Sequence, residues 1–215
     1  MFSLVEMVLE EDEFHSESVS STKYIHTTPQ KMAKYEVIDQ DPLFSKVVRY
    51  FRGSDYLTWA GATVAGPLSL ILLEKFEPAS GRQFKMPKPM FLRAGGLIGF
   101  TAGFFIAYNQ STKRFWGVSE NAREVQKDRY ETKALLALGK NPYGSDESTL
   151  SPYLQDLSAR YSRNSQFLIG ILPWFNFVQH PYHGVDLKKY YEVREGEENW
   201  NFDLVPLDQI KGLPN

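Results

Sequence analysis

The sequence predicts a mainly α-helical fold: a two-helix transmembrane hairpin with an N-terminal amphipathic helix and an extended, partly helical C-terminal docking segment. Two uncharged runs carry this prediction, Tyr56–Leu73 and Ala94–Thr112. At a rise of about 1.5 Å per residue each run forms a helix of about 27 to 28 Å, close to the hydrocarbon thickness of a bilayer. No alternating apolar and polar pattern favours a sheet. The alternative is a buried hairpin in a soluble protein, which is disfavoured because neither run has a polar face wide enough to meet water.

The composition excludes several classes of protein. The 215 residues carry 24 Lys and Arg against 26 Asp and Glu, and a formal net charge of −2 argues against a general nucleic-acid-binding protein. The absence of cysteine excludes disulfides, thiolate zinc sites, cysteine-ligated iron–sulfur clusters and cysteine nucleophiles. The mean hydropathy of −0.37 is typical of a soluble protein because polar flanks hide the two apolar runs in the average.

Residues 1–31 form the first predicted domain, a disordered acidic tail. It holds six acids, two lysines and no arginine, whereas a mitochondrial transit peptide is rich in Arg and poor in acids. Its apolar residues offer too little area to offset the entropy of ordering. A second alternative is that Met32 is the working start of the protein.

A short amphipathic helix is expected before the first run, in a second predicted domain that covers residues 32–139. Asp41 followed by Pro42 is a typical helix start, and Gly53 offers an end. The apolar residues that repeat at i, i+3, i+4 and i+7 are Phe44, Val47, Val48 and Phe51. The basic side, which we expect to contact lipid headgroups, consists of Lys46, Arg49 and Arg52.

Both uncharged runs contain small residues four apart, which leave one face of each helix almost bare. Such rows let helix backbones approach closely in lipid. We expect them to pack the hairpin, or to dock it on helices of a larger membrane complex; the alternative is that glycine is simply common in membrane helices. The predicted packing residues are Gly61, Ala65 and Ser69 in the first run and Gly95, Gly99, Gly103 and Ala107 in the second.

The connector between the runs, residues 74–93, is a basic loop with five Lys or Arg against two Glu. We expect this loop to lie against anionic headgroups. Seven Lys or Arg flank the outer ends of the two runs, so the distribution of basic residues does not decide the orientation of the hairpin. It favours only weakly an arrangement with both termini on the positive side.

The C-terminal half is expected to dock on a partner. A helix from Lys113 to Leu138 ends at Gly139, and residues 140–165 form a linker with a short helix from Pro152. Residues 166–215 are rich in aromatic side chains, and their apolar stretch from Phe167 to Val178 is too short, and too broken by Pro173, to span a bilayer. The predicted partner-docking residues are Trp174, Phe175, Phe177 and Tyr182. The alternative is a small core of the chain's own.

The sequence offers little for catalysis. His180 and His183 are three residues apart, but no further His or Cys lies near them, and a closed metal site needs about four ligands. A phosphate-binding glycine loop, a strand-linked GxGxxG and a GxSxG elbow are absent from the sequence. We therefore expect no catalytic residue, no metal, no cofactor and no small-molecule substrate.

Two long strings resemble a known family in family order. They are YEVIDQDPLFSKVVRYFRGSDYLTWAGATVAGPLSLILLEKFEP at residues 35–78 and PWFNFVQHPYHGVDLKKYYE at residues 173–192. They resemble the fungal-type twenty-one-kilodalton accessory subunit of mitochondrial NADH:ubiquinone oxidoreductase, respiratory complex I. The resemblance implies a non-catalytic subunit with two spans in the inner membrane, which stabilises or assembles the complex and has its other subunits as partners. The alternative is an independent inner-membrane adaptor or assembly factor anchored by the same hairpin.

Overall fold

The computed structural model describes residues 33–77, 86–143, 150–168 and 175–210. Its helices are α2 (Phe44–Arg49), α3 (Gly53–Phe76), α4 (Pro89–Phe115), α5 (Ala122–Ala137) and α6 (Pro152–Leu168), followed by the 3-10 helices η3 (Leu187–Tyr190) and η4 (Leu207–Gln209). Within these ranges the β structure is limited to one isolated bridge between Leu43 and Asn176. The mainly α-helical prediction is confirmed. The acidic tail of residues 1–31 and the middle of the connector, residues 78–85, lie outside the described residues. The ends of the predicted connector loop are helical, because α3 continues to Phe76 and α4 begins at Pro89.

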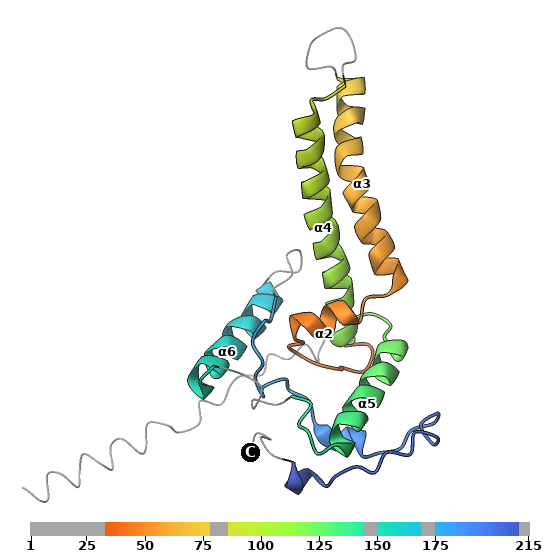
Figure 1. The fold of residues 1–215 in the computed structure, drawn as a ribbon, viewed down its shortest axis with the longest axis vertical. Coiled ribbons are helices and arrows are strands. Elements are labelled where there is room, and N and C mark those ends of the chain that lie inside the picture. Colours follow the sequence, from red (N-terminus) through yellow and green to blue (C-terminus); the bar gives the residue numbers. More distant parts are fainter. Residues whose placement is uncertain (1–32, 78–85, 144–149, 169–174, 211–215) are drawn as a thin grey trace, which may run out of the picture.

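Helices α3 and α4 form a long antiparallel hairpin that rises from a base made of α2, α5, α6 and the C-terminal segment (Figure 1). With 24 and 27 residues, the two helices are about 36 and 40 Å long. Their most apolar 18-residue stretches have mean hydropathies of 1.5 and 1.6, and only 0 % and 22 % of these stretches are buried. A hairpin inside a soluble core would be mostly buried, so this exposure favours the membrane interpretation.

The helix predicted from Lys113 to Leu138 is wrong, because α4 and α5 are separate helices. Gly117 has a φ of +68° and donates its N–H to the carbonyl of Arg114, while the N–H of Val118 donates to Lys113. This pair of bonds is the Schellman motif, which ends a helix on a glycine. Gly139, with a φ of +67°, ends α5 in the same way, at the predicted place.

The start and the end predicted for the short amphipathic helix are also wrong. Leu43, and not Asp41, precedes the first turn of α2. The helix ends at Arg49, and Gly53, the predicted end, begins α3. Asp41 is fully buried instead and accepts a hydrogen bond from Ser162 of α6 at 2.6 Å. The carboxylate is therefore used to join distant segments and cannot cap the helix beside it.

Two clusters of buried side chains hold the base together. The first joins α2 to the lower half of α4 and consists of Ile38, Val47, Tyr50, Phe51, Ala107, Tyr108 and Phe115. The second joins α5 to the C-terminal segment and consists of Leu136, Tyr143, Leu187, Tyr190 and Ile210. The hairpin and the C-terminal segment are thus fixed to one folded base.

Candidate functional site

Three glycines of α4 bring the two hairpin helices into backbone contact. A Cβ added at Gly99 would overlap the carbonyl oxygen of Ala62, and one added at Gly103 would lie 2.8 Å from the carbonyl oxygen of Trp59. At Gly95 an added Cβ would lie 2.8 Å from Leu70 Cδ1. At Gly99 and Gly103 no larger residue fits unless the helices move apart, whereas at Gly95 the end of the Leu70 side chain can shift.

The side of α3 that meets α4 differs from the row that sequence spacing suggested. The contact is made by Trp59, Ala62, Gly66 and Leu70. The predicted row, Gly61, Ala65 and Ser69, is exposed, and an added Cβ at Gly61 would meet nothing within 4 Å. A role for this row in docking on helices outside the chain stays a prediction. Ala107, the last of the predicted residues on α4, is buried in the first core cluster.

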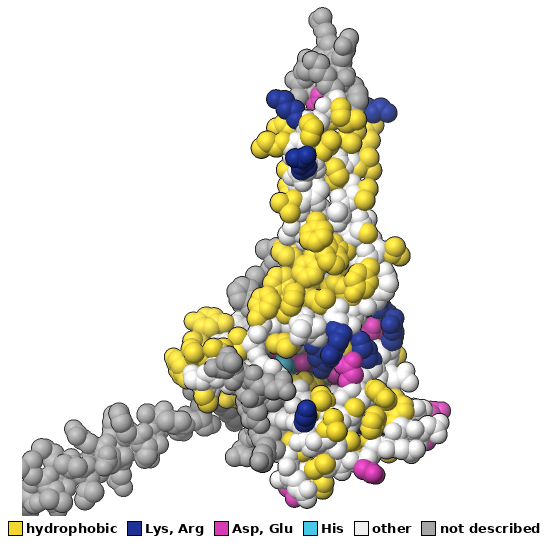
Figure 2. All heavy atoms as spheres, in the orientation of Figure 1, with side chains coloured by type: hydrophobic (Ala, Val, Ile, Leu, Met, Phe, Trp, Pro, Cys, Tyr) yellow, Lys and Arg dark blue, Asp and Glu magenta, His cyan; other side chains and the backbone are white. Residues whose placement is uncertain are grey.

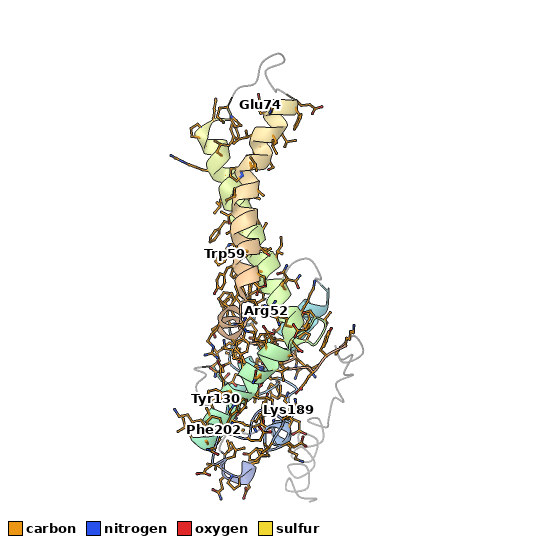
Figure 3. The ribbon with its side chains drawn as sticks, turned by 90° about the vertical axis from the view of Figure 1, so that its right-hand side faces the viewer. Arg52, Trp59, Glu74, Tyr130, Lys189 and Phe202 are labelled. Carbon is orange, nitrogen blue, oxygen red and sulfur yellow. The ribbon has the colours of Figure 1, made fainter. Side chains whose placement is uncertain are left out.

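Aromatic side chains gather around the lower half of the hairpin, where Figure 2 shows a broad hydrophobic patch. Trp59, labelled in Figure 3, lies 5.0 Å from the ring of Phe100 and 5.2 Å from that of Phe104. Its indole N–H donates to the carbonyl of Phe100 at 3.0 Å. We call this group the aromatic belt; Trp, the residue type at its centre, is enriched at the boundary between a membrane and water.

A layer of buried charges lies directly below this belt. Asp55, on the first turn of α3, is paired with Arg114, on the last turn of α4, and the two are 0 % and 6 % exposed. Arg52 pairs with Glu124 of α5 at 2.5 Å and with Glu120 at 3.0 Å. The hydrogen bond to Glu124 is the main reason why the pKa of Arg52 is raised above its ordinary value. The layer joins both ends of the hairpin base to α5.

The cations of α2 face carboxylates of the same chain. Lys46, whose side chain is only 19 % exposed, pairs with Asp128 at 2.7 Å. Burial lowers the pKa of Lys46, but Asp128, Asp39 and Glu131 together outweigh burial and the net shift of the pKa is upward. Arg49 pairs with Glu131 at 2.9 Å. Headgroup binding by Lys46, Arg49 and Arg52 stays a prediction, and the structure gives each of them a counter-ion on α5 or at its start.

Two aspartate–histidine pairs tie the segment before α2 to the segment after α6. His180 Nε2 lies 3.0 Å from Asp41 Oδ2, and His183 Nδ1 lies 3.0 Å from Asp39 Oδ1. The two imidazole rings are stacked with centroids 4.6 Å apart. His180 Nδ1 accepts the backbone N–H of Tyr182 at 3.1 Å, so Nε2 carries the proton that is donated to Asp41. Burial raises the pKa of Asp39, but His183 more than offsets this, so the pKa is lowered.

Three of the four ring nitrogens of these histidines therefore contact carboxylates or backbone of the same chain. Within the described part of the chain, no group of three or more His, Cys, Asp or Glu side chains is placed to hold a metal ion. The arrangement is suited to holding two distant segments together. Sequence reasoning missed this pairing because about 140 residues separate the partners and only the HPYH spacing gave a signal.

The C-terminal segment is bound along α5 by a second set of ionic contacts. Glu197 accepts from the guanidinium of Arg129 and from Lys133 Nζ, the latter at 2.6 Å. Arg129 also donates to the carbonyls of Lys189 and Glu192 at 2.9 and 2.7 Å. Burial raises the pKa of Glu197, but the hydrogen bonds from Arg129 and Lys133 outweigh it and lower the pKa to about 2.

Aromatic contacts extend this attachment. The ring of Tyr130 on α5 meets the edges of Trp200 and Phe202, each with centroids 5.3 Å apart. Figure 3 shows Tyr130 and Phe202 close together at the far end of the base. The phenol of Tyr190 donates to Asp128 at 2.6 Å. The segment predicted to dock thus makes extensive contacts within its own chain.

The four predicted docking residues have different environments. Trp174 lies outside the described residues. Phe175 packs inside the chain, with its ring 4.8 Å from Tyr108 and 5.3 Å from Phe44. Phe177 and Tyr182 are 68 % and 39 % exposed. Docking on a partner stays a prediction, for which Phe177 and Tyr182 are the available surface.

Comparison with known proteins gives concordant matches over both halves of the chain. Residues 32–120 match the family described as the 21 kDa subunit of NADH-ubiquinone oxidoreductase complex I. Residues 129–213 match the family described as the C-terminal of the NADH-ubiquinone oxidoreductase 21 kDa subunit. The NADH-ubiquinone oxidoreductase 20.9 kDa subunit of Neurospora crassa is 45 % identical over 163 residues, which cover 76 % of this chain and 84 % of that protein.

Proposed function

Because the chain belongs to the family of the 21 kDa subunit of NADH-ubiquinone oxidoreductase complex I, we propose that it is an accessory subunit of this complex in the mitochondrial inner membrane. The observation that carries the proposal is the identity of 45 % over 84 % of the Neurospora protein. The two family matches cover the hairpin and the C-terminal segment, and the match to the relative extends over 163 residues, so the likeness is not limited to two apolar helices. The role is structural, and NADH oxidation and quinone reduction belong to other subunits.

The hairpin is the membrane anchor of this subunit. Helices α3 and α4 are long and apolar enough to cross a bilayer twice. The aromatic belt around Trp59 and the charged layer at Asp55 lie at successive levels, as expected for a membrane boundary followed by water. The base that contains α2, α5 and α6 then lies outside the hydrocarbon on one side.

The subunit stabilises the complex by contacts made from three exposed surfaces. The first is the outer face of α3, which includes Gly61, Ala65 and Ser69. The second is Phe177 and Tyr182 beside the hairpin base. The third is α6, which buries Gln155, Ala159 and Ser162 and exposes Tyr153, Leu154 and Tyr161. An amphipathic helix with its larger apolar residues outward fits a site that is completed by a neighbour.

Native electrophoresis tests the proposal. Mitochondrial membranes are solubilised in a mild detergent, separated by blue-native electrophoresis and probed with an antibody to this chain. We expect stable co-migration with NADH dehydrogenase activity, and resistance of the chain to carbonate extraction. Migration as a free protein, or association only with incomplete assemblies, would instead support the adaptor or assembly-factor alternative.

A further inference from the structure

The hairpin carries charge at both ends, and the two charged levels are one bilayer thickness apart. Asp55 and Lys75 lie near opposite ends of α3, and Arg93 and Arg114 lie near opposite ends of α4. The rise of the α-helix separates the two members of each pair by about 30 Å along the axis, the thickness of the hydrocarbon core. When the base lies at one headgroup region, Lys75 and Arg93 therefore lie at the other.

The two levels differ in how their cations are neutralised. At the base, Arg114 and Arg52 are paired with Asp55 and Glu124. The cations at the far end, which we call the tip cations, are Lys75, Lys88 and Arg93; they are exposed and form no ion pair with any part of the chain that the structure describes. Figure 2 shows Lys and Arg side chains standing out from this end of the hairpin, and Figure 3 places Glu74 there.

The surroundings of the tip cations match a lipid leaflet. Exposed apolar side chains lie within a few residues of them on both helices, with Phe76, Met90 and Phe91 being 77 %, 77 % and 56 % exposed. Such side chains are suited to contact acyl chains, while the long stems of Lys and Arg carry their charges to the headgroup level. Residues 74–93 hold five Lys or Arg against two Glu, so the segment has an excess of positive charge.

We propose that Lys75, Lys88 and Arg93 bind the phosphate groups of anionic phospholipids in the leaflet opposite the folded base. The inference rests on the proposed insertion of α3 and α4 in the membrane and adds a ligand class at the tip. The proposal assigns the headgroup contacts of the chain to the tip cations. The cations of α2 already form ion pairs with carboxylates of the protein. Each Lys or Arg near an anionic surface strengthens the attraction about fivefold.

The test uses the full chain in nanodiscs that contain equal amounts of phosphatidylcholine and phosphatidylglycerol. Native mass spectrometry of the released protein measures the ratio of retained anionic to neutral lipid. The double variant Lys75→Gln/Arg93→Gln is compared with Lys140→Gln/Lys188→Gln, which removes two exposed charges from the base that form no ion pair among the described residues. Carbonate extraction of the chain from membranes scores insertion separately.

We expect wild type and the base variant to retain phosphatidylglycerol preferentially, and the tip variant to lose this preference on the order of tenfold. High salt should weaken the preference. If the wild-type chain is inserted but shows no preference for the anionic lipid, the inference is overturned and the proposed function stays intact. This result is expected if the tip contacts an acidic protein surface instead. An equal loss in both variants also overturns it, because general charge attraction would then explain the binding. Repeating the measurement with cardiolipin in place of phosphatidylglycerol shows whether the tip binds a doubly charged lipid more strongly than a singly charged one. Stronger binding of the doubly charged lipid supports the inference.

Discussion

Asp55 and Arg114 form a buried ion pair that closes the hairpin at its base, although 59 residues separate them in the chain. Asp55 also accepts the backbone N–H of Arg52 at 2.7 Å, so one carboxylate caps α3 and neutralises the end of α4. Glu124 lies 3.6 Å from the same arginine. The pair therefore joins the first turn of α3 to the last turn of α4, and Glu124 connects this junction to α5.

Removal of the Asp55 charge should destabilise the chain strongly. Asp55→Asn leaves Arg114 buried without its main counter-ion, and we expect a loss of about 3 kcal/mol in the free energy of unfolding. The loss should be read from thermal unfolding of the detergent-solubilised full chain. Asp156→Asn, which weakens the exposed pair with Arg160 within α6, is the matched control and should cost less than about 1 kcal/mol. Equal midpoints for the two variants would refute the importance of the buried pair.

The glycine contact predicts opposite results for two neighbouring positions. Gly99→Ala places a methyl group against the carbonyl oxygen of Ala62, which forces the helices apart and should cost about 1 to 3 kcal/mol. Gly96→Ala places the same group in open space, and the higher helix propensity of alanine should make it neutral or stabilising by up to about 1 kcal/mol. Circular dichroism during a titration with a denaturing detergent measures both. A similar loss in both variants would show that backbone contact does not hold the hairpin.

Glu197 should give the C-terminal attachment a specific acid sensitivity. Its pKa is lowered to about 2 by Arg129 and Lys133, so its contribution is complete above the ordinary value near 4.5 and disappears as the pH falls toward 2. We expect the unfolding temperature of wild type to drop over this interval. Glu197→Gln should lower stability at neutral pH and flatten the dependence.

The control for this profile is Glu195→Gln, because Glu195 is exposed and has no ion pair among the described residues. Its profile should follow that of wild type. A Glu197→Gln profile that remains parallel to wild type between pH 5 and pH 2 would assign the acid sensitivity to another carboxylate.

Local pattern predicted the hairpin but not all of its contacts. The two uncharged runs locate α3 and α4, although the helices, with 24 and 27 residues, extend beyond the runs at both ends. The four-residue spacing shows which face of α4 is bare. Helix α3 has two candidate rows of small residues, one that contains Gly61 and one that contains Ala62 and Gly66. Only the position of α4 decides between them, and that depends on tertiary packing at Asp55 and Arg114, which spacing along one helix does not contain.

The base was less predictable because its contacts join residues far apart in the sequence. The helix expected from Lys113 to Leu138 rests on apolar residues at helical spacing, namely Phe115, Val118, Ala122 and Val125. Gly117 instead turns the chain, so that Glu124 of α5 can pair with Arg52. The glycine was a visible signal for this turn. The burial of Asp41 was not, because its partner His180 is 139 residues away.

Phe175 and Phe177 provide a test that separates internal packing from docking on a partner. Phe175 packs against Phe44, Phe104 and Tyr108, so Phe175→Ala should cost about 2 kcal/mol or more of chain stability. Phe177 is 68 % exposed and contacts the ring of Phe44 at 4.9 Å, so Phe177→Ala should cost the isolated chain no more than about 1 kcal/mol. If Phe177 is an anchor in a partner surface, the same substitution should weaken incorporation into the complex by about 2 kcal/mol or more. Thermal unfolding of the purified chain measures the loss of stability, and blue-native electrophoresis after mild heating measures incorporation into the complex. Full incorporation of Phe177→Ala would show that the aromatic segment packs only within its own chain.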